Sequence, residues 1–178
     1  QISGADITIS STVPTKAGYT FQNTWTTNSD GTGTSYASNT QYTFTEDSTI
    51  YAKWNANTNT AYTVEHYKEQ ADGTYAIDSA LTENLTGTTG ATVNAVAKAY
   101  AGYTEDTTNS DRVASGTISG DGNLTLKLYY KTNADTAYKV EHYKQRADGT
   151  YPTTADETEN LSGVTGANVT ATAKTYAG

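Results

Sequence analysis

The only two histidines of the chain each follow a glutamate, in two copies of one phrase. Glu65-His66 lies in TAYTVEHYKEQADGTY (Thr60 to Tyr75), and Glu141-His142 lies in TAYKVEHYKQRADGTY (Thr136 to Tyr151). A histidine oriented by a carboxylate can serve as a general base. Strand alternation, however, places neighbouring side chains on opposite faces, which argues against such a pair. We therefore expect both rings to pack as structural residues and predict no catalytic residue.

Two polar turns offer oxygen atoms that could bind a metal ion. They are Asn28-Ser29-Asp30-Gly31 and Asp121-Gly122-Asn123. Neither matches the spacing of a calcium loop with a distant glutamate. Turn formation is the simpler interpretation, because Asp, Asn and Gly stabilise tight turns. The sequence thus predicts no metal, no cofactor and no enzymatic activity.

Lysine, glutamate and asparagine recur in both copies of the repeated region, at Lys98 and Lys174, Glu83 and Glu159, and Asn84 and Asn160. Such residues could form an intramolecular Lys–Asn isopeptide bond, which needs a buried lysine and a buried asparagine beside an acid. Glu83 and Asn84 are sequence neighbours and would point to opposite faces of a strand. This placement argues against the bond.

These residues belong to an internal repeat with an offset of 76 residues. Thr60–Gly102 aligns with Thr136–Gly178 without a gap, and 28 of the 43 positions are identical. Repetition at a fixed period indicates one structural part that is copied along the chain. The second copy has no counterpart of Tyr103–Lys131 in this sequence. We therefore expect an exposed sheet edge there, which strand exchange with a neighbouring chain could complete.

Strands and turns account for most of the repeat. Alternation in Tyr62–Tyr67 predicts a strand with Val64 and His66 on one face, and Asp72-Gly73 predicts the turn of a hairpin. Leu124–Tyr130 is the clearest strand pattern in the chain. The pattern of Gly90–Gly102 fits either a helical face or a strand, and we favour a short helix or an irregular crossover packed on the sheet. The predicted fold class is mostly β (α+β).

Overall composition narrows the possible partners. The 178 residues carry a net charge of -8 and no Cys. Negative charge disfavours nucleic acid and anionic membranes, and the lack of Cys excludes disulfides and thiolate sites. No run of 18 apolar residues could span a bilayer. Because the chain begins with Gln1 and contains no Met, we expect an internal piece of a longer polypeptide.

The first 54 residues carry a different pattern. It consists of PTKAGYTF (Pro14 to Phe21), then Trp25, then YTFTEDSTIYAKW (Tyr42 to Trp54). This pattern resembles the Listeria-Bacteroides repeat, the B-repeat of internalin B, which is found in many copies in bacterial surface proteins. The insertion at Gln22-Asn23-Thr24 departs from the family pattern and predicts a bulge or a wider turn. The leading strand of the family is absent or reduced to Ile7-Thr8-Ile9.

The 76-residue repeat is similar to the mucin-binding-protein (MucBP) repeats of Gram-positive surface proteins. The residues that carry this resemblance are Tyr62-Thr63-Val64-Glu65, Asp72-Gly73-Thr74-Tyr75, Gly102-Tyr103 and Leu126-Lys127-Leu128-Tyr129-Tyr130. Together the two resemblances imply tandem β-grasp (ubiquitin-like) modules in an elongated array.

Three modules follow from these patterns: module 1 at 1–54, module 2 at 60–131 and module 3, truncated, at 136–178. The polar linkers Asn55–Asn59 and Thr132–Asp135 should let neighbouring modules pivot. The resemblances imply a non-catalytic stalk or spacer of an adhesin, extracellular at a bacterial cell surface or cell wall. The alternative is a binding module for host mucin glycans or a host surface protein.

Overall fold

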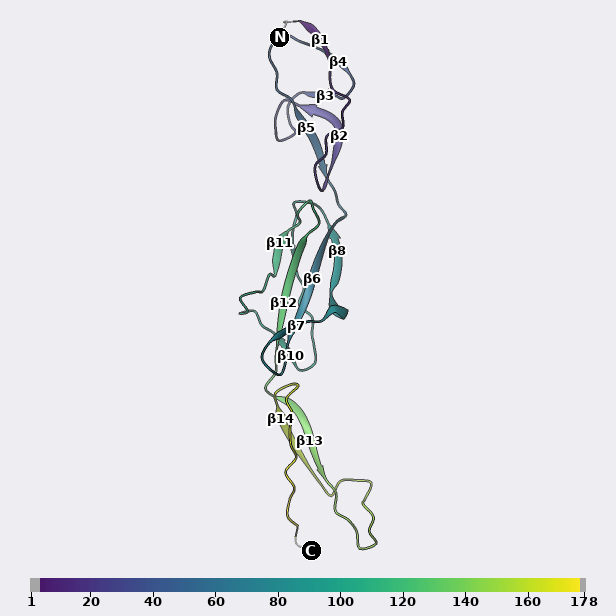
Figure 1. The fold of residues 1–178 in the computed structure, drawn as a ribbon, viewed down its shortest axis with the longest axis vertical. Helices are drawn as coiled ribbons and strands as arrows, with labels where there is room; N and C mark the ends of the chain where they lie inside the picture. The colour runs from purple at the N-terminus through teal and green to yellow at the C-terminus, as the bar shows by residue number, and fades with distance from the viewer. Residues whose placement is uncertain (1–3, 177–178) are drawn as a thin grey trace. The chain divides into compact units, whose positions relative to one another are not determined.

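The computed structural model describes residues 4–176, which form strands joined by turns and irregular segments (Figure 1). Within these residues the one helical element is the 3-10 helix η1 (Ser79–Leu81), and no α-helix occurs. The mostly β class is therefore confirmed, whereas the β-grasp topology stays a prediction. The chain forms two compact units. The N-terminal unit comprises Gln1–Val64, Glu83–Asn94 and Ser115–Leu126, and the C-terminal unit comprises Glu65–Thr82, Ala95–Ala114 and Lys127–Gly178.

Module 1 lies in the N-terminal unit and consists of two small antiparallel sheets. Its strands are β1 (Ala5–Thr8), β2 (Tyr19–Thr26), β3 (Ser35–Ala37), β4 (Gln41–Phe44) and β5 (Tyr51–Ala56). β1 pairs with β4, and β2 lies between β3 and β5. Phe21 packs edge-on against Trp25 at 5.4 Å between ring centroids, and its ring lies tilted against that of Trp54 at 5.6 Å. The aromatic residues of the family-like pattern thus build the core of this module.

Two details of module 1 test the sequence interpretation. The register of β2 with β5 shifts between Phe21 and Trp25, and Asn23 has a φ of 54°. This confirms the bulge, since Asn tolerates the left-handed region better than most residues. The leading strand is present as β1 and pairs with β4, so the reduced strand expected at Ile7-Thr8-Ile9 was misplaced. Ile9 lies beyond its end and is buried.

The rest of the N-terminal unit belongs to module 2. Its elements are the first half of β6 (Thr60–Glu69), β8 (Glu83–Gly87), β9 (Thr92–Asn94), β11 (Ser115–Thr117) and the start of β12 (Leu124–Thr132). β8 pairs antiparallel with β6, and β11 with β9. Val64, Ile118 and Leu126 are fully buried. Gly87 leaves room for this core, because a Cβ there would lie 2.5 Å from Ile118 Cδ1.

The C-terminal unit continues both long strands. The second half of β6 pairs with β7 (Tyr75–Ile77), and the end of β12 pairs with β10 (Tyr103–Glu105). The strand order of the sheet is β10-β12-β6-β7, with β8 also on β6. Module 3 contributes the antiparallel pair β13 (Thr136–His142) and β14 (Glu157–Gly163).

Module 2 contains the predicted hairpin and the predicted Leu-rich strand but not the predicted helix. The hairpin at Asp72-Gly73 is confirmed by β6 and β7, with a φ of 80° at Gly73. The Leu-rich strand is confirmed by β12. The helix alternative for Gly90–Gly102 is wrong, because this segment contains the short strand β9 and then runs irregularly. A hydrogen bond from Ala95 N–H to the Ala114 carbonyl extends the β9–β11 pairing instead.

The predicted linkers are shorter than expected. Residues assigned to the first linker belong to strands, since β5 ends at Ala56 and β6 begins at Thr60. In the second, β12 ends at Thr132 and β13 begins at Thr136. The segments between the strands are therefore residues 57–59 and 133–135. The polar composition of these residues predicted loops. Asn and Thr can, however, also lie in a β-strand and form its backbone hydrogen bonds.

Leu126→Ala should lower the free energy of unfolding by about 2–5 kcal/mol, because it removes a fully buried side chain and leaves a cavity. Urea denaturation followed by intrinsic fluorescence measures the change. Leu161→Ala is the matched control, since that side chain is 39% exposed and its loss should cost less than about 1 kcal/mol. Equal costs for the two variants would contradict the placement of Leu126 in the core.

Candidate functional site

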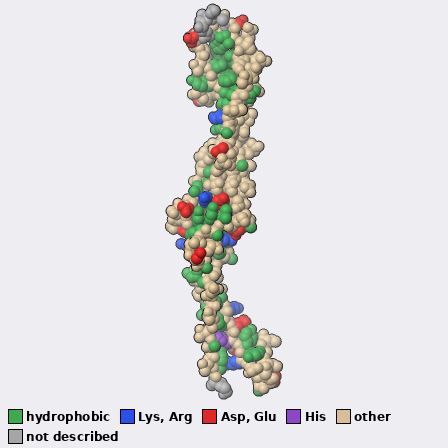
Figure 2. Space-filling model, viewed as in Figure 1, with side chains coloured by type: hydrophobic (Ala, Val, Ile, Leu, Met, Phe, Trp, Pro, Cys, Tyr) green, Lys and Arg blue, Asp and Glu red, His purple; other side chains and the backbone are tan. Residues whose placement is uncertain are grey.

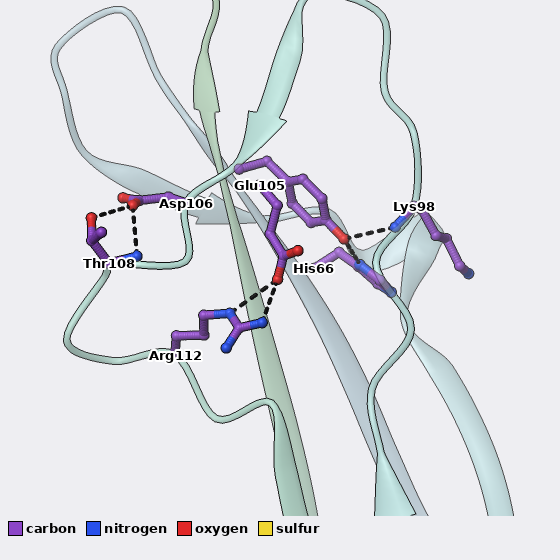
Figure 3. A network of polar contacts seen from close by, with 7 residues as sticks. His66, Lys98, Glu105, Asp106, Thr108 and Arg112 are labelled. Atoms are coloured by element: carbon purple, nitrogen blue, oxygen red, sulfur yellow. Dashed lines mark hydrogen bonds and ion pairs between the residues drawn. The ribbon is translucent and has the colours of Figure 1, made fainter.

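The histidine of module 2 lies in a buried aromatic cluster of the C-terminal unit. His66 on β6 is 0% exposed, and Tyr130 on β12 is 1% exposed. His66 Nδ1 lies 3.0 Å from the Tyr130 hydroxyl, and that hydroxyl accepts a hydrogen bond from the Lys98 backbone N–H at 3.1 Å. Figure 3 shows these contacts converging on one oxygen atom. Tyr130 thus joins a strand to the irregular segment that follows β9.

Ring packing encloses His66 further. Its imidazole stacks on Tyr130 with 5.7 Å between centroids and an interplanar angle of 27°. Tyr100 meets Tyr130 edge-on at 4.7 Å and His66 at 6.1 Å. Such edge-on and offset arrangements are the preferred geometries of aromatic pairs. A ring so enclosed cannot reach a substrate in solvent while the cluster is closed, and its chemistry here is that of a packing and hydrogen-bonding group.

The opposite face of β6 carries a second aromatic cluster. Tyr67 stacks on Tyr129 with 4.8 Å between centroids, and Tyr75 of β7 packs edge-on against Tyr129 at 5.2 Å. Tyr67 donates its hydroxyl hydrogen to Glu65 at 2.7 Å, and Tyr75 donates to Asp106 at 2.9 Å. The Glu65 carboxylate therefore accepts a hydrogen bond from Tyr67 and does not orient His66. This agrees with the prediction that Glu65 and His66 point to opposite faces.

These two hydroxyls have raised pKa values. The hydrogen bond to Glu65 raises the pKa of Tyr67 to about 12. Burial, followed by the hydrogen bond to Asp106, raises the pKa of Tyr75 to about 12. In both cases a nearby carboxylate disfavours the phenolate.

Ion pairs line the edge of the same unit. Arg112 donates to Glu105 through Nε at 3.0 Å and through a terminal nitrogen at 2.6 Å. Asp106 accepts from the Thr108 backbone and hydroxyl nearby, as Figure 3 shows. Every partner in these pairs belongs to the segment that includes β10 and the loop after it. The arrangement fixes a loop and does not converge on an open site.

The histidine of module 3 lies beside a glutamate of the neighbouring strand. His142 Nε2 lies 2.7 Å from Glu159 Oε1, and Lys174 Nζ lies 2.8 Å from the same carboxylate. Lys174 also pairs with Glu157. Hydrogen bonds to these two carboxylates raise the pKa of Lys174. Glu141, the neighbour of His142 in the sequence, instead accepts from the Tyr143 hydroxyl at 2.8 Å.

Sequence reasoning missed Glu159 as the partner of His142. The pairing of β13 with β14 sets Val140 opposite Glu159 and His142 opposite Glu157, and in this register the Glu159 carboxylate reaches the ring of His142. That register is not fixed by a direct hairpin turn, because residues 143–156 separate the two strands and the Asp148-Gly149 turn among them closes only the local pairing of Arg146 with Thr150. The signal that could have helped was the recurrence of Glu83, Lys98 and their counterparts in both copies.

The two predicted polar turns use their carboxylates internally. Asp30 accepts from the Thr32 backbone N–H at 2.9 Å and from its hydroxyl at 2.6 Å. Asp121 accepts from the Asn123 N–H at 3.2 Å. Hydrogen bonds with Thr32 lower the pKa of Asp30, and a hydrogen bond with Ser119 first of all lowers that of Asp121. Within residues 4–176, no three His, Cys, Asp or Glu residues form a group that could hold a metal ion.

The isopeptide candidates are not brought into a buried site. Asn84 in β8 and Asn160 in β14 are both exposed. Lys174 is held by the two carboxylates described above. An amide exchange of this kind needs a buried lysine and asparagine, so the geometry does not favour the bond.

Module 3 carries an open groove on one face of the β13–β14 pair. Its volume is about 400 Å³, and its lining includes Tyr138, Val140, Leu161 and the side of Lys174. Val140 is only half-buried, whereas its counterpart Val64 is fully buried. Two tyrosines of module 3 outside the groove lining are also exposed, Tyr143 by 42% and Tyr151 by 62%. The groove thus presents apolar side chains of module 3 to solvent.

Rising pH should destabilise the C-terminal unit between about pH 10 and about pH 12. An unfolded tyrosine loses its proton near pH 10, whereas folded Tyr67 and Tyr75 keep theirs to about 12. In this window the folded state binds more protons than the unfolded state, so the free energy of unfolding falls as pH rises. Denaturation midpoints across this range measure the slope.

The double variant Tyr67→Phe, Tyr75→Phe should remove this part of the slope. Tyr151→Phe is the control, because that side chain is largely exposed and the slope should not change. A slope that is equal in all three proteins would show that the two hydrogen-bonded hydroxyls do not cause it.

Comparison with known proteins bears on module 1. The family model of the Listeria-Bacteroides repeat domain matches residues 2–53, as the quoted residues predicted. No curated protein and no solved structure matches the chain. No helix within residues 4–176 is long and apolar enough to cross a membrane. The Listeria-Bacteroides repeat occurs in bacterial surface or extracellular proteins, so the match gives a coarse indication that this region is an extracellular repeat.

Proposed function

We propose that this chain is a non-catalytic repeat region of a bacterial cell-surface protein and acts as the stalk or spacer of an adhesin. The observation that carries the proposal is the match of residues 2–53 to the Listeria-Bacteroides repeat domain, next to a second repeat in the same chain. Tandem repeats add length in units that each contact their neighbours. A spacer needs that property and no reactive group.

The use of aromatic residues supports a structural role. In module 2, Tyr67, Tyr75, Tyr129 and Tyr130 pack against one another or against His66. Glycan-binding surfaces commonly expose aromatic rings, and these rings are engaged in the sheet. Figure 2 shows that the visible face is mostly uncharged, with acidic and basic side chains scattered over it. This face carries no dominant charged patch that would indicate a charged ligand.

We also propose that modules 2 and 3 are MucBP-like repeats. The residues that carry this resemblance lie in β6, in the turn that leads into β7, at the start of β10 and in β12. They are therefore the residues that form strands and the hairpin of module 2. If module 3 follows the same plan, its groove lacks the strand that β12 supplies in module 2.

We propose that a strand with the pattern of β12 completes module 3, supplied by a neighbouring segment or chain. In module 2, β12 brings Leu126 and Tyr130 to the face that carries Val64 and His66. The corresponding face of module 3 carries Val140 and His142 and borders the groove. The same side chains should accept the same strand.

A peptide with the sequence of residues 121–132 should bind module 3 of the full 178-residue chain. Chemical-shift changes should appear at Val140 and His142 and should leave module 1 unaffected. A peptide with Leu126→Ser and Leu128→Ser is the matched control and should bind at least about tenfold more weakly, because it loses two apolar side chains. Equal binding of the two peptides, or no shift at Val140, would overturn strand completion without touching the spacer proposal.

Deletion of residues 60–135 removes one repeat period and tests the spacer. An epitope fused to the N-terminus of the chain, displayed on a cell surface, should become less accessible to a large antibody-coated particle after the deletion. Its affinity for the free antibody should not change, because the deletion alters distance and not the epitope. Accessibility that is independent of the deletion would contradict a spacer.

Saturable binding of the full chain to mucin glycans on an array would favour the binding-module alternative. The spacer proposal expects none. Loss of such binding in Tyr143→Ala or Tyr151→Ala would identify the exposed rings of module 3 as the contact surface.

A further inference from the structure

The connection between consecutive modules is built twice from the same residue types. One side is a corner with the sequence Ala-Gly-Tyr-Thr, at 17–20 in module 1 and at 101–104 in module 2. The other side belongs to the following module and its linker. It consists of a linker asparagine (Asn57 or Asn133), a strand threonine (Thr60 or Thr136) and a loop threonine (Thr89 or Thr165).

The first junction lies within the N-terminal unit. Asn57 donates its backbone N–H to the Gly18 carbonyl at 2.9 Å, and its own carbonyl accepts the Thr89 N–H at 2.9 Å. The Thr20 hydroxyl donates to Asn57 Oδ1 at 2.7 Å. The hydroxyls of Thr60 and Thr89 lie 2.6 Å apart, and both residues are buried. The asparagine is therefore held through its backbone on both sides and through its side chain.

The second junction lies within the C-terminal unit and repeats these bonds. Asn133 donates its backbone N–H to the Gly102 carbonyl at 2.8 Å, and its carbonyl accepts the Thr165 N–H at 2.9 Å. The Thr104 hydroxyl donates to Asn133 Oδ1 at 2.7 Å. The hydroxyls of Thr136 and Thr165 again form a hydrogen bond, and the Thr165 hydroxyl also contacts the Gly102 carbonyl at 2.7 Å.

Both glycines are required by geometry. Gly18 has a φ of 74° and Gly102 a φ of 80°, a region that residues with a Cβ rarely adopt. A Cβ at Gly18 would lie 2.4 Å from the Gly120 Cα and 2.6 Å from the Thr89 hydroxyl. A Cβ at Gly102 would lie 2.7 Å from the Thr165 hydroxyl. The loop threonine thus packs directly against the bare Cα of the corner in both junctions.

The two corners belong to modules of different sequence families. Gly18 lies in the segment that matches the Listeria-Bacteroides repeat, whereas Gly102 lies in the 76-residue repeat. Their local turns nevertheless agree, because Tyr19 N–H donates to the Lys16 carbonyl at 3.0 Å and Tyr103 N–H to the Tyr100 carbonyl at 3.1 Å. The partner side is the same repeat in both cases. What the junctions share is therefore the corner itself and not the module around it.

We propose that the Gly-Tyr-Thr corner is a binding surface whose partner is the next module along the chain, recognised by an Asn-x-x-Thr linker and a Thr-Gly loop. The corner accepts any module with those residues, whatever the family of the module that carries the corner. Because the asparagine backbone is bonded on both sides, a pivot at the linker requires these bonds to break. The proposal holds whether or not the array is a spacer.

Amide hydrogen exchange at the junctions tests the proposal in the full chain. The amides of Asn57, Thr89, Asn133 and Thr165 should all be protected. Gly102→Ala should speed exchange at Asn133 and Thr165 by about tenfold or more, since it opens two bonds of that junction. Asn57 and Thr89 in the same molecule serve as the internal control and should not change.

Gly73→Ala is the matched control variant. Gly73 has a φ of 80° like Gly102, but nothing lies within 4 Å of a Cβ built there. It should leave all four junction amides protected. Thr165→Val, which only removes a hydroxyl, should speed exchange at Asn133 and Thr165 while the Lys127 amide stays protected, which shows that module 2 remains folded. Unprotected junction amides in the unaltered chain, or equal effects of Gly102→Ala and Gly73→Ala, would overturn the proposal.

Deletion of residues 60–135 tests whether the corner is general. In that variant the corner of module 1 meets the loop of module 3 through Asn57 and Thr136. The amides of Asn57 and Thr165 should then be protected as in the unaltered chain. Free exchange at both positions would show that each junction is specific to its own pair of modules.

Discussion

Two adjacent tyrosines on β12 hold the two sides of the module 2 sheet together. Because neighbouring residues in a strand point to opposite faces, Tyr130 packs with His66 on one side and Tyr129 packs with Tyr67 on the other. The dipeptide Tyr129-Tyr130 therefore packs against both faces of the long strand β6. Among the described residues of module 3, β13 is the counterpart of β6, and no strand corresponds to β12. There Tyr143, the counterpart of Tyr67, is 42% exposed, whereas His142 is largely covered and contacts Glu159. The described residues show no strand equivalent to β7.

Much of the fold of module 2 was predictable from the sequence, because it depends on local patterns. Alternation identified β6 and β12, and Asp-Gly identified the hairpin. The sequence predicted that His66 is a packed structural ring. It did not predict that the ring packs against Tyr130. That contact joins residues 64 positions apart, and no local pattern specifies which aromatic residue closes over which strand. The partner of His142 was missed for a similar reason, since it depends on the register of β13 and β14.

The linkers show where composition misleads. A run of Asn, Thr and Ala between modules predicts a flexible linker. The Asn and Thr side chains can nevertheless accept and donate hydrogen bonds in fixed positions. Asn57 and Asn133 use the backbone N–H, the backbone carbonyl and Oδ1. The signal was present in the sequence as a coincidence between two repeats, because Ala-Gly-Tyr-Thr precedes both linkers. It could be recognised only by comparing modules that are otherwise dissimilar.

The placement of the corner and its partner bears on how such a chain can change its length in evolution. Module 2 carries the partner residues near its start, at Asn57 and Thr60, and a corner near Gly102. A duplication of one 76-residue period therefore brings both halves of a connection at once. Recombination between copies can add or remove modules without the selection of a new contact surface, so the number of modules can vary while each remaining connection keeps its hydrogen bonds.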